Sequence, residues 1–132
     1  MTSEENAKYF DLYTTGIGYL YRVREVTPPE GTPFVSVTIA ALRGNVDDAH
    51  YTRFECRVSG KQAQDLVRQL QPAVEGKLKV LIGFMLNDLF AEPYTIKNGD
   101  KAGETVVSLK ARLLRVTWAK VDGEPFRHEH AA

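Results

Sequence analysis

Basic and aromatic side chains alternate along several segments of this chain. Tyr51, Arg53 and Arg57 share one parity of a segment whose other parity is apolar. Aromatic rings stack on unpaired bases, for roughly 1–3 kcal/mol per base, while cationic groups bind the phosphates. The pattern therefore favours a surface for single-stranded nucleic acid. The residues that carry it are Tyr19, Tyr21, Arg22, Arg24, Phe34, Arg43, Tyr51, Arg53, Arg57, Phe84, Phe90 and Tyr94.

The same residues have a second interpretation. Tyrosine and arginine are ordinary residues on the exposed face of a strand, and Phe34 and Phe84 could belong to the core. The chain has 17 basic and 17 acidic residues, so its formal net charge is zero. Nucleic-acid-binding domains usually carry a basic excess. A protein-interaction domain that binds no nucleic acid therefore stays open.

Residues suited to catalysis or metal binding are sparse. The sequence shows no Ser-His-Asp or Cys-His grouping, and its glycines follow neither nucleotide-binding fingerprint. Asp47 and Asp48 occupy a turn, where aspartate is common, and His128 and His130 belong to a polar terminal run. Cys56 falls on an apolar parity, which predicts a small core residue. We expect no enzyme, no metal site and no cofactor.

Length and composition predict one soluble domain. The 132 residues suit a single core, and 43% of them are hydrophobic. No apolar run approaches the roughly 20 residues that cross a membrane, and the polar, acidic N-terminal residues are unlike a secretory signal. One cysteine excludes an internal disulfide, and a reducing cytoplasmic location is the natural interpretation.

The periodicity of apolar residues predicts five strands and one helix. Most segments alternate apolar and polar residues, as half-buried strands do. From Lys61 to about Val74 the apolar residues recur at helical spacing, and Ser59 is a candidate N-cap. Gly16 and Gly18 indicate a bulge or a sharp coil in the first strand. The predicted strands are 11–26, 34–43, 51–59, 77–86 and 105–121, and residues 87–104 are expected to form a long hairpin.

This order of elements predicts an all-β domain of the OB type, a five-stranded Greek-key barrel with the order β-β-β-α-β-β. Short strands joined by turn-rich links favour a closed or nearly closed barrel. A parallel α/β sheet would need more helices between its strands. We expect the OB domain to span residues 11–122, between a flexible arm at 1–10 and a polar tail at 123–132.

Three segments resemble bacterial single-stranded-DNA-binding proteins. Residues 31–40 are similar to that family's second strand, residues 51–61 to its third strand and the following Gly-Lys, and residues 76–83 to its fourth strand. The resemblance implies that Tyr51 occupies the position of a stacking tryptophan and that Arg53 matches the family's arginine. It also implies assembly as a homodimer or homotetramer.

The chain departs from that family's pattern at two places. Arg57 falls close to a position where the family has a stacking phenylalanine, and Phe90 or Tyr94 could stand near the aromatic of its last hairpin. The family's acidic tail ending in Pro-Phe is absent, so recruitment of repair partners through such a tail is not implied. We expect the apolar strand at 80–86 to supply an edge for assembly.

The whole chain further resembles a family of small bacterial proteins of integrative and conjugative elements, labelled as element replication proteins. The resemblance rests on residues 9–20, 40–44 and 107–113. It implies a role in the maintenance of DNA, with replication or conjugation proteins as partners.

These observations predict a non-catalytic domain that binds single-stranded DNA, largely independently of sequence, in the replication or transfer of a mobile element. RNA is an alternative ligand, and no membrane is expected as a partner. The predicted binding residues are Tyr21, Arg22, Tyr51, Arg53, Arg57, Phe84 and Phe90, with Arg43 and Lys110 as phosphate contacts. The alternative function is an OB-fold protein-interaction module without nucleic-acid binding.

Overall fold

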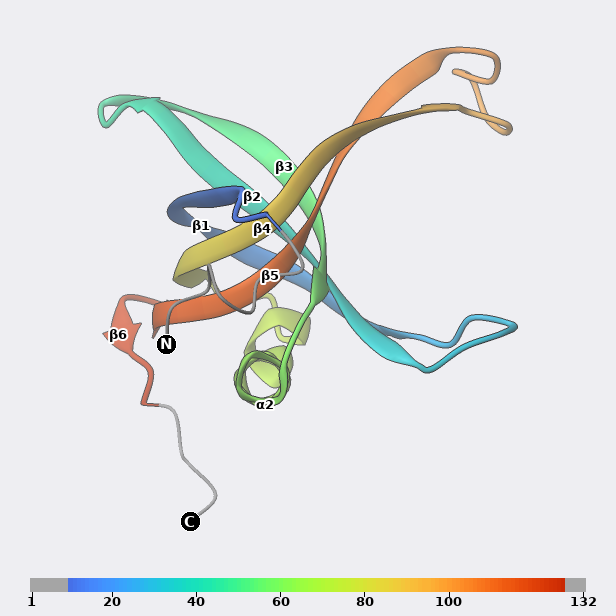
Figure 1. Ribbon diagram of the computed structural model, residues 1–132. Helices are drawn as coiled ribbons and strands as arrows, with labels where there is room; N and C mark the ends of the chain where they lie inside the picture. Colours follow the sequence, from blue (N-terminus) through green and yellow to red (C-terminus); the bar gives the residue numbers. More distant parts are fainter. Residues whose placement is uncertain (1–9, 128–132) are drawn as a thin grey trace.

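The chain folds in the order that its periodicity predicts: three strands, one helix and two further strands (Figure 1). The computed structural model describes residues 10–127. Its elements are β1 (Tyr13–Val26), β2 (Phe34–Asn45), β3 (Asp48–Val58), α2 (Lys61–Glu75), β4 (Val80–Thr95), β5 (Thr105–Val121) and the short β6 (Glu124–Pro125).

The five long strands close into a barrel. Neighbouring strands pair in the order β3-β2-β1-β4-β5, all antiparallel, and β3 then pairs with β5 in parallel from Glu55 to Val58. This closure, with the helix between β3 and β4, confirms the predicted OB-type barrel. The β2–β3 and β4–β5 hairpins extend well beyond the barrel (Figure 1).

The interior is filled by the apolar parity of each strand. Leu20, Ile39, Ile82 and Leu113 are each at most 1% exposed, and burial of such a side chain contributes about 1.5–3 kcal/mol. Helix α2 packs against β1, β4 and β5 and adds one apolar stripe to this core. The buried residues of α2 are Ala63, Leu66, Val67, Leu70 and Val74.

The helix begins differently from the expectation. Its N-cap is Gly60, with φ 91° and no side-chain capping bond. The backbone N–H of Ser59 donates instead to the carbonyl oxygen of Leu113, at 2.9 Å. Ser59 therefore extends the contact between β3 and β5, and its prediction as the N-cap is wrong. Glycine suits the capping position because it has no Cβ to oppose a positive φ.

Strand β4 pairs on both sides over its first half. Between Leu81 and Leu86 it is the partner of β1 on one side and of β5 on the other. A strand paired on both sides offers no free edge to another chain. The expectation that the strand at 80–86 supplies an edge for assembly is therefore wrong.

The second half of β4 forms the long hairpin that was predicted at 87–104. β4 continues to Thr95, and its pairing with β5 ends at the Thr95–Thr105 pair. Much of the residue range predicted as a connection is thus regular strand, because cross-strand hydrogen bonds continue past the barrel wall.

Strand β1 bends sharply between its two neighbours. A register shift lies between Leu20 and Arg22, so the bulge falls after the glycines rather than at them. Gly18 has another role: a Cβ there would lie 2.6 Å from the carbonyl oxygen of Ala40. Only glycine allows this close approach of β1 to β2.

Part of the segment predicted as a polar tail belongs to the barrel. Glu124–Pro125 pairs with β5, and the N–H of Phe126 donates to the carbonyl oxygen of Ala119 at 2.9 Å. Phe126 also packs against the core. Residues 128–132 of the predicted tail and residues 1–9 of the predicted arm lie outside the described residues.

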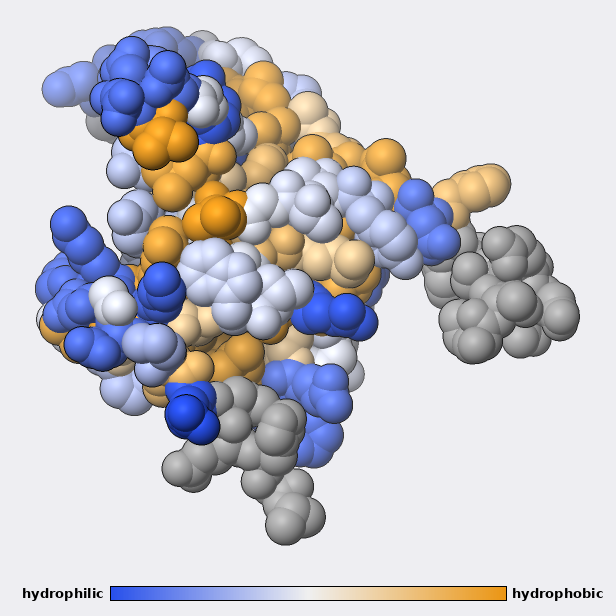
Figure 2. Space-filling view, turned by 90° about the vertical axis from the view of Figure 1, so that its left-hand side faces the viewer, coloured by the Kyte–Doolittle hydropathy of each residue, from blue (hydrophilic) through white to orange (hydrophobic). Residues whose placement is uncertain are grey.

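The surface carries large hydrophobic side chains as well as charges. Figure 2 shows the side toward which β6 and the tip of the β2–β3 hairpin project in Figure 1. Hydrophobic and weakly polar residues cover much of its middle, and many strongly hydrophilic residues lie toward its periphery. Among residues 10–127, no helix is both long and apolar enough to cross a membrane.

Candidate nucleic-acid interface

The outer face of β2 forms a shallow floor between two higher walls. Ser36, Thr38 and Ala40 alternate with buried apolar residues, and all three have small side chains. The strand register places Tyr19 of β1 on one side of Ala40 and Arg53 of β3 on the other. This groove crosses the face over the second and third strands, which OB folds use to bind oligonucleotides.

A hollow of about 580 Å³ occupies one part of this face, lined by Tyr19, Ala40, Tyr51, Arg53 and Val107. The ring centroids of Tyr19 and Tyr51 are 6.4 Å apart, and their planes are inclined by 51°. Tyr51 is 56% exposed. A hollow lined by an exposed ring, a half-buried ring and one guanidinium can receive a planar base beside a phosphate.

The bulge in β1 exposes two further side chains, Tyr21 and Arg22, on the β1 side of the β2 floor. Leu20 and Val23 are buried while Tyr21 and Arg22, between them, are both exposed. The Arg53 guanidinium carbon lies 5.6 Å from the centroid of the Tyr21 ring, within the range of a cation–π contact. The structure thus brings Tyr21 to Arg53 and places Arg22 opposite Thr38 on the neighbouring strand.

Arg57 stacks on an aromatic ring at the end of the face where β2 begins. Its guanidinium carbon lies 4.2 Å from the centroid of Phe34, which is half-buried. Arg57 is exposed and makes no ion pair within the described chain. A guanidinium plane can itself stack on a base, so Arg57 offers a platform where the resemblance led us to expect a phenylalanine.

Phe84 does not belong to this surface, and its prediction as a binding residue is wrong. It is 3% exposed and meets Phe54 edge to face, with centroids 6.3 Å apart. Its ring also covers Gly16, where a Cβ would lie 3.1 Å away. Phe84 shares the parity of Val80, Ile82 and Leu86, which are all buried, so regular alternation along β4 points this side chain into the barrel.

Three other predicted residues lie at the edges of the face. Phe90 is 52% exposed and is the cross-strand partner of Lys110 on the β4–β5 hairpin. The ammonium of Lys110 lies 3.1 Å from the Glu92 carboxylate, which neutralises part of its charge. Near the β2–β3 tip, the Nε of Arg43 donates to the hydroxyl of Thr52 at 2.9 Å.

One carboxylate, that of Glu55, lies between Arg53 and Arg57 on the outer face of β3. Glu55 accepts a hydrogen bond from the hydroxyl of Thr38 at 2.8 Å, which satisfies that buried hydroxyl. Arg53 and Arg57 flank Glu55 along β3, and neither forms an ion pair in the described part of the chain. Although the chain is neutral overall, the exposed face of β3 therefore carries more positive than negative charge.

The sequence prediction left out three residues that line the hollow. Tyr19 belonged to the basic and aromatic pattern but was not chosen as a binding residue, and Ala40 and Val107 were not considered. Parity alone places Tyr19 on the outer face of β1. The contribution of Ala40 and Val107 depends on register between strands, which no local pattern encodes.

Cys56 is a core residue, as predicted. It is 1% exposed, and desolvation by burial raises the pKa of its thiol to about 12, with a smaller contribution from the charge of Glu55. A thiol with so high a pKa is unreactive at neutral pH. Across residues 10–127 no three His, Cys, Asp or Glu side chains are grouped to hold a metal ion. His128 and His130 lie outside the described residues.

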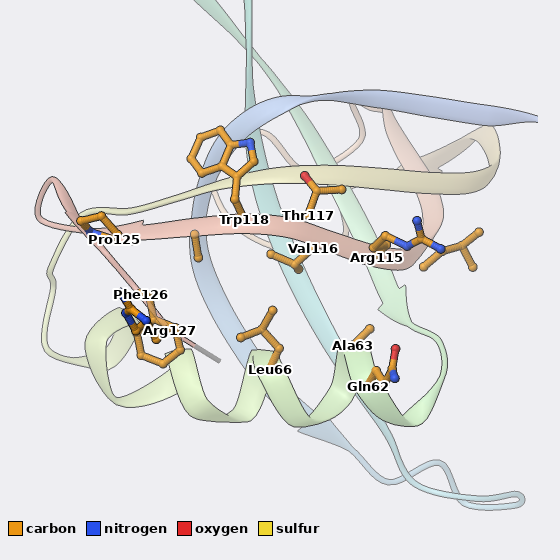
Figure 3. A pocket seen from close by; sticks show the side chains of 12 residues that line it. Gln62, Ala63, Leu66, Arg115, Val116, Thr117, Trp118, Pro125, Phe126 and Arg127 are labelled. Carbon is orange, nitrogen blue, oxygen red and sulfur yellow. The ribbon is translucent and has the colours of Figure 1, made fainter. Parts of the chain in front are cut away.

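A larger hollow of about 1020 Å³ lies between α2 and β5 (Figure 3). Leu66 of α2 and Val116 of β5 point into it, and Phe126 stands at one end. None of the residues predicted to bind nucleic acid lines this hollow, so it is separate from the face over β2 and β3.

Comparison with known proteins yields one family. No curated protein and no solved structure matches the chain. A family model described as "Protein of unknown function (DUF3577)" matches residues 3–132. Because this match covers almost the whole sequence, the chain belongs to the DUF3577 family.

Proposed function

We propose that this protein is a non-catalytic binder of single-stranded DNA. The observation that carries the proposal is the hollow formed by Tyr19, Ala40 and Tyr51 with Arg53 at its rim. It combines two tyrosine rings, one of them exposed, with a cation, and it lies over the strands that OB folds use for oligonucleotides. Stacking makes no distinction among bases, so we expect binding to be largely independent of sequence.

The biological setting is part of the same proposal. The similarity of residues 9–20, 40–44 and 107–113 to proteins of integrative and conjugative elements supports a role in the replication or transfer of such an element. We propose homodimeric or homotetrameric assembly, replication or conjugation proteins as partners, and RNA as an alternative ligand. The buried, unpaired Cys56 suits the reducing cytoplasm.

One observation favours a second function. The formal net charge is zero, and Glu55 places a carboxylate in the middle of the basic face. An OB-fold module that binds another protein and no nucleic acid would tolerate both features. The two functions differ in one directly measurable property, which is affinity for an unpaired oligonucleotide.

The test is a titration of fluorescently labelled oligo-dT of about 15 nucleotides, which exceeds many OB-fold sites. Fluorescence anisotropy would be followed at about 50 mM and about 200 mM salt, because phosphate contacts make affinity fall as salt rises. We expect binding at micromolar protein or below in the lower salt, and weaker binding in the higher salt. Absence of binding at micromolar protein and low salt would overturn the proposal.

Two variants connect the binding to the hollow. We expect Tyr51→Ala to weaken the affinity by roughly 5- to 150-fold, the range for loss of one stacked base. Tyr13→Ala is the matched control, since Tyr13 is 49% exposed on β1 but does not line the hollow. Equal losses in the two variants would contradict a site centred on Tyr51.

A further inference from the structure

Trp118, the single tryptophan of the chain, stands on the outer surface of β5. It is 39% exposed. Figure 3 shows its indole projecting from β5 to the side opposite Leu66 and Val116, which point into the hollow between α2 and β5. Trp118 is therefore not a core residue: it borders that hollow, but its ring points to the other side of β5.

A glycine on the neighbouring strand leaves room for this ring. Trp118 is the cross-strand partner of Gly83 on β4. A Cβ at position 83 would collide with the indole Nε1, so a glycine is needed beneath the ring. The Lys120 ammonium lies 5.9 Å from the ring centroid. An exposed ring beside a cation that forms no ion pair within residues 10–127 is a combination similar to that of Tyr51 and Arg53.

The strand register joins this position to the hollow over β2. One cross-strand row runs from Arg53 through Ala40, Tyr19 and Leu81 to Lys120. Its four strand spacings of 4.7–4.9 Å add up to about 19 Å along the surface. A strand stacked at 3.4 Å per nucleotide covers that length with about six nucleotides, within the size of known OB-fold sites.

A second row lies beside the first. It runs from Ile17 through Gly83 to Trp118, and Ile17 is 45% exposed. The surface between Tyr19 and Trp118 is thus continuous, and it contains no carboxylate in either row.

The path from the hollow toward Trp118 and the path in the opposite direction around the barrel, toward Phe90, differ in charge. In that other direction, the row two residues along β3 from Arg53 runs from Glu55 through Lys110 to Phe90, and Lys110 is paired with Glu92. A polyanion that follows this row would approach two carboxylates. Toward Trp118, the rows contain only uncharged residues and the cation of Lys120.

We propose that Trp118 and Lys120 form a second subsite for single-stranded DNA, reached by a strand that continues from the Tyr19–Tyr51 hollow across β1 and β4. The indole stacks on one base and the ammonium contacts a neighbouring phosphate. This inference rests on the proposed function and adds a path and a second contact point to it.

The wild-type protein supplies the first test without substitution. Trp118 is the only indole, and a base stacked on an indole quenches its emission. We expect titration with unlabelled oligo-dT of about 15 nucleotides to quench the tryptophan emission. The midpoint should match that of the anisotropy titration. Binding by anisotropy with unchanged tryptophan emission would overturn the subsite and leave the proposed function standing, whereas no binding would overturn both.

Variants then measure its contribution. We expect Trp118→Ala to weaken the affinity by roughly 5- to 150-fold and Trp118→Phe to restore most of it, because a smaller ring still stacks. Lys120→Ala should lower the salt slope, log affinity against log salt, by about 0.7, as loss of one phosphate contact does for a single strand. The charge-matched control is Lys61→Ala, on α2. Wild-type affinity in Trp118→Ala would overturn the subsite.

Discussion

The rings of Tyr19 and Tyr51 approach each other to 6.4 Å between centroids, from two strands that are not neighbours. β2 runs between them, with Ala40 as the cross-strand partner of Tyr19 and Leu42 as that of Tyr51; of these two, Ala40 lines the hollow. A methyl group is too short to fill the space between the two rings. The small side chain at position 40 therefore helps to keep the hollow open.

Filling the hollow should block binding without removing any aromatic ring. Ala40→Leu places a branched side chain between Tyr19 and Tyr51, so we expect oligo-dT affinity to fall by at least about tenfold, the equivalent of one stacked base. The anisotropy titration measures this, with urea unfolding to show that the variant is folded. Ala102→Leu, in the exposed β4–β5 turn, is the control. Wild-type affinity in Ala40→Leu would contradict the location of the site.

Neutralising Glu55 should strengthen binding. Glu55→Gln removes the one negative charge between Arg53 and Arg57 and keeps an oxygen that can accept the Thr38 hydrogen bond. Exposed charges interact over roughly one Debye length, about 10 Å at 0.1 M salt, so the gain should shrink as salt rises. Anisotropy titrations at two salt concentrations measure it. Glu75→Gln, on α2, is the matched change away from this face. A weaker complex in Glu55→Gln would show that the carboxylate itself contacts the ligand.

Gly18 and Gly16 should respond differently to alanine. A Cβ at Gly18 would meet backbone atoms of Ala40 and Ala41 at 2.6 and 2.7 Å, and backbone in a sheet cannot move aside cheaply. We expect Gly18→Ala to lower the free energy of unfolding by about 1–3 kcal/mol, the usual cost of overpacking.

Gly16→Ala is the internal comparison, because its Cβ would meet only the Phe84 ring, at 3.1 Å. The Phe84 side chain can shift slightly, and alanine also restricts the unfolded chain, which contributes about 0.4–1 kcal/mol in the opposite direction. Urea unfolding of both variants gives the ordering. A larger loss at Gly16 than at Gly18 would show that β1 does not approach β2 as described.

The stability of the protein should fall in alkali partly because of Cys56. Burial raises the pKa of this thiol to about 12, while in the unfolded chain it is about 8.5. The unfolded state therefore releases the proton first. Cys56 contributes no pH dependence below about pH 8, and its contribution to the free energy of unfolding is lost as the pH rises from about 8.5 to 12.

Comparison with Cys56→Ala isolates this effect from the other titrating groups. Between about pH 8 and about pH 10, the wild type should lose about 2 kcal/mol more than the variant. Urea unfolding at the two pH values measures the difference. Parallel losses in both proteins would mean that the thiol is not desolvated in the folded state.

Local sequence determined the type and order of the five long strands and the helix. The alternation in 34–43 and 51–59 and the helical spacing from Lys61 to about Val74 were each visible within one segment, because side-chain burial follows the period of the backbone. The same reasoning placed Tyr51, Arg53 and Arg57 on the outer face of β3, and Cys56 on its inner face, where the structure has them.

Tertiary structure decided what these patterns could not. The strand at 80–86 lost its expected edge because β1 and β5 pair with it on both sides. The burial of Phe84, by contrast, follows the parity of Val80, Ile82 and Leu86 and was already present in the local pattern. The hollow between Tyr19 and Tyr51, like the row that leads to Lys120, exists only once five strands are aligned. That alignment is set by hydrogen bonds and packing between segments far apart in the chain, so a shift of one residue in any strand would remove it.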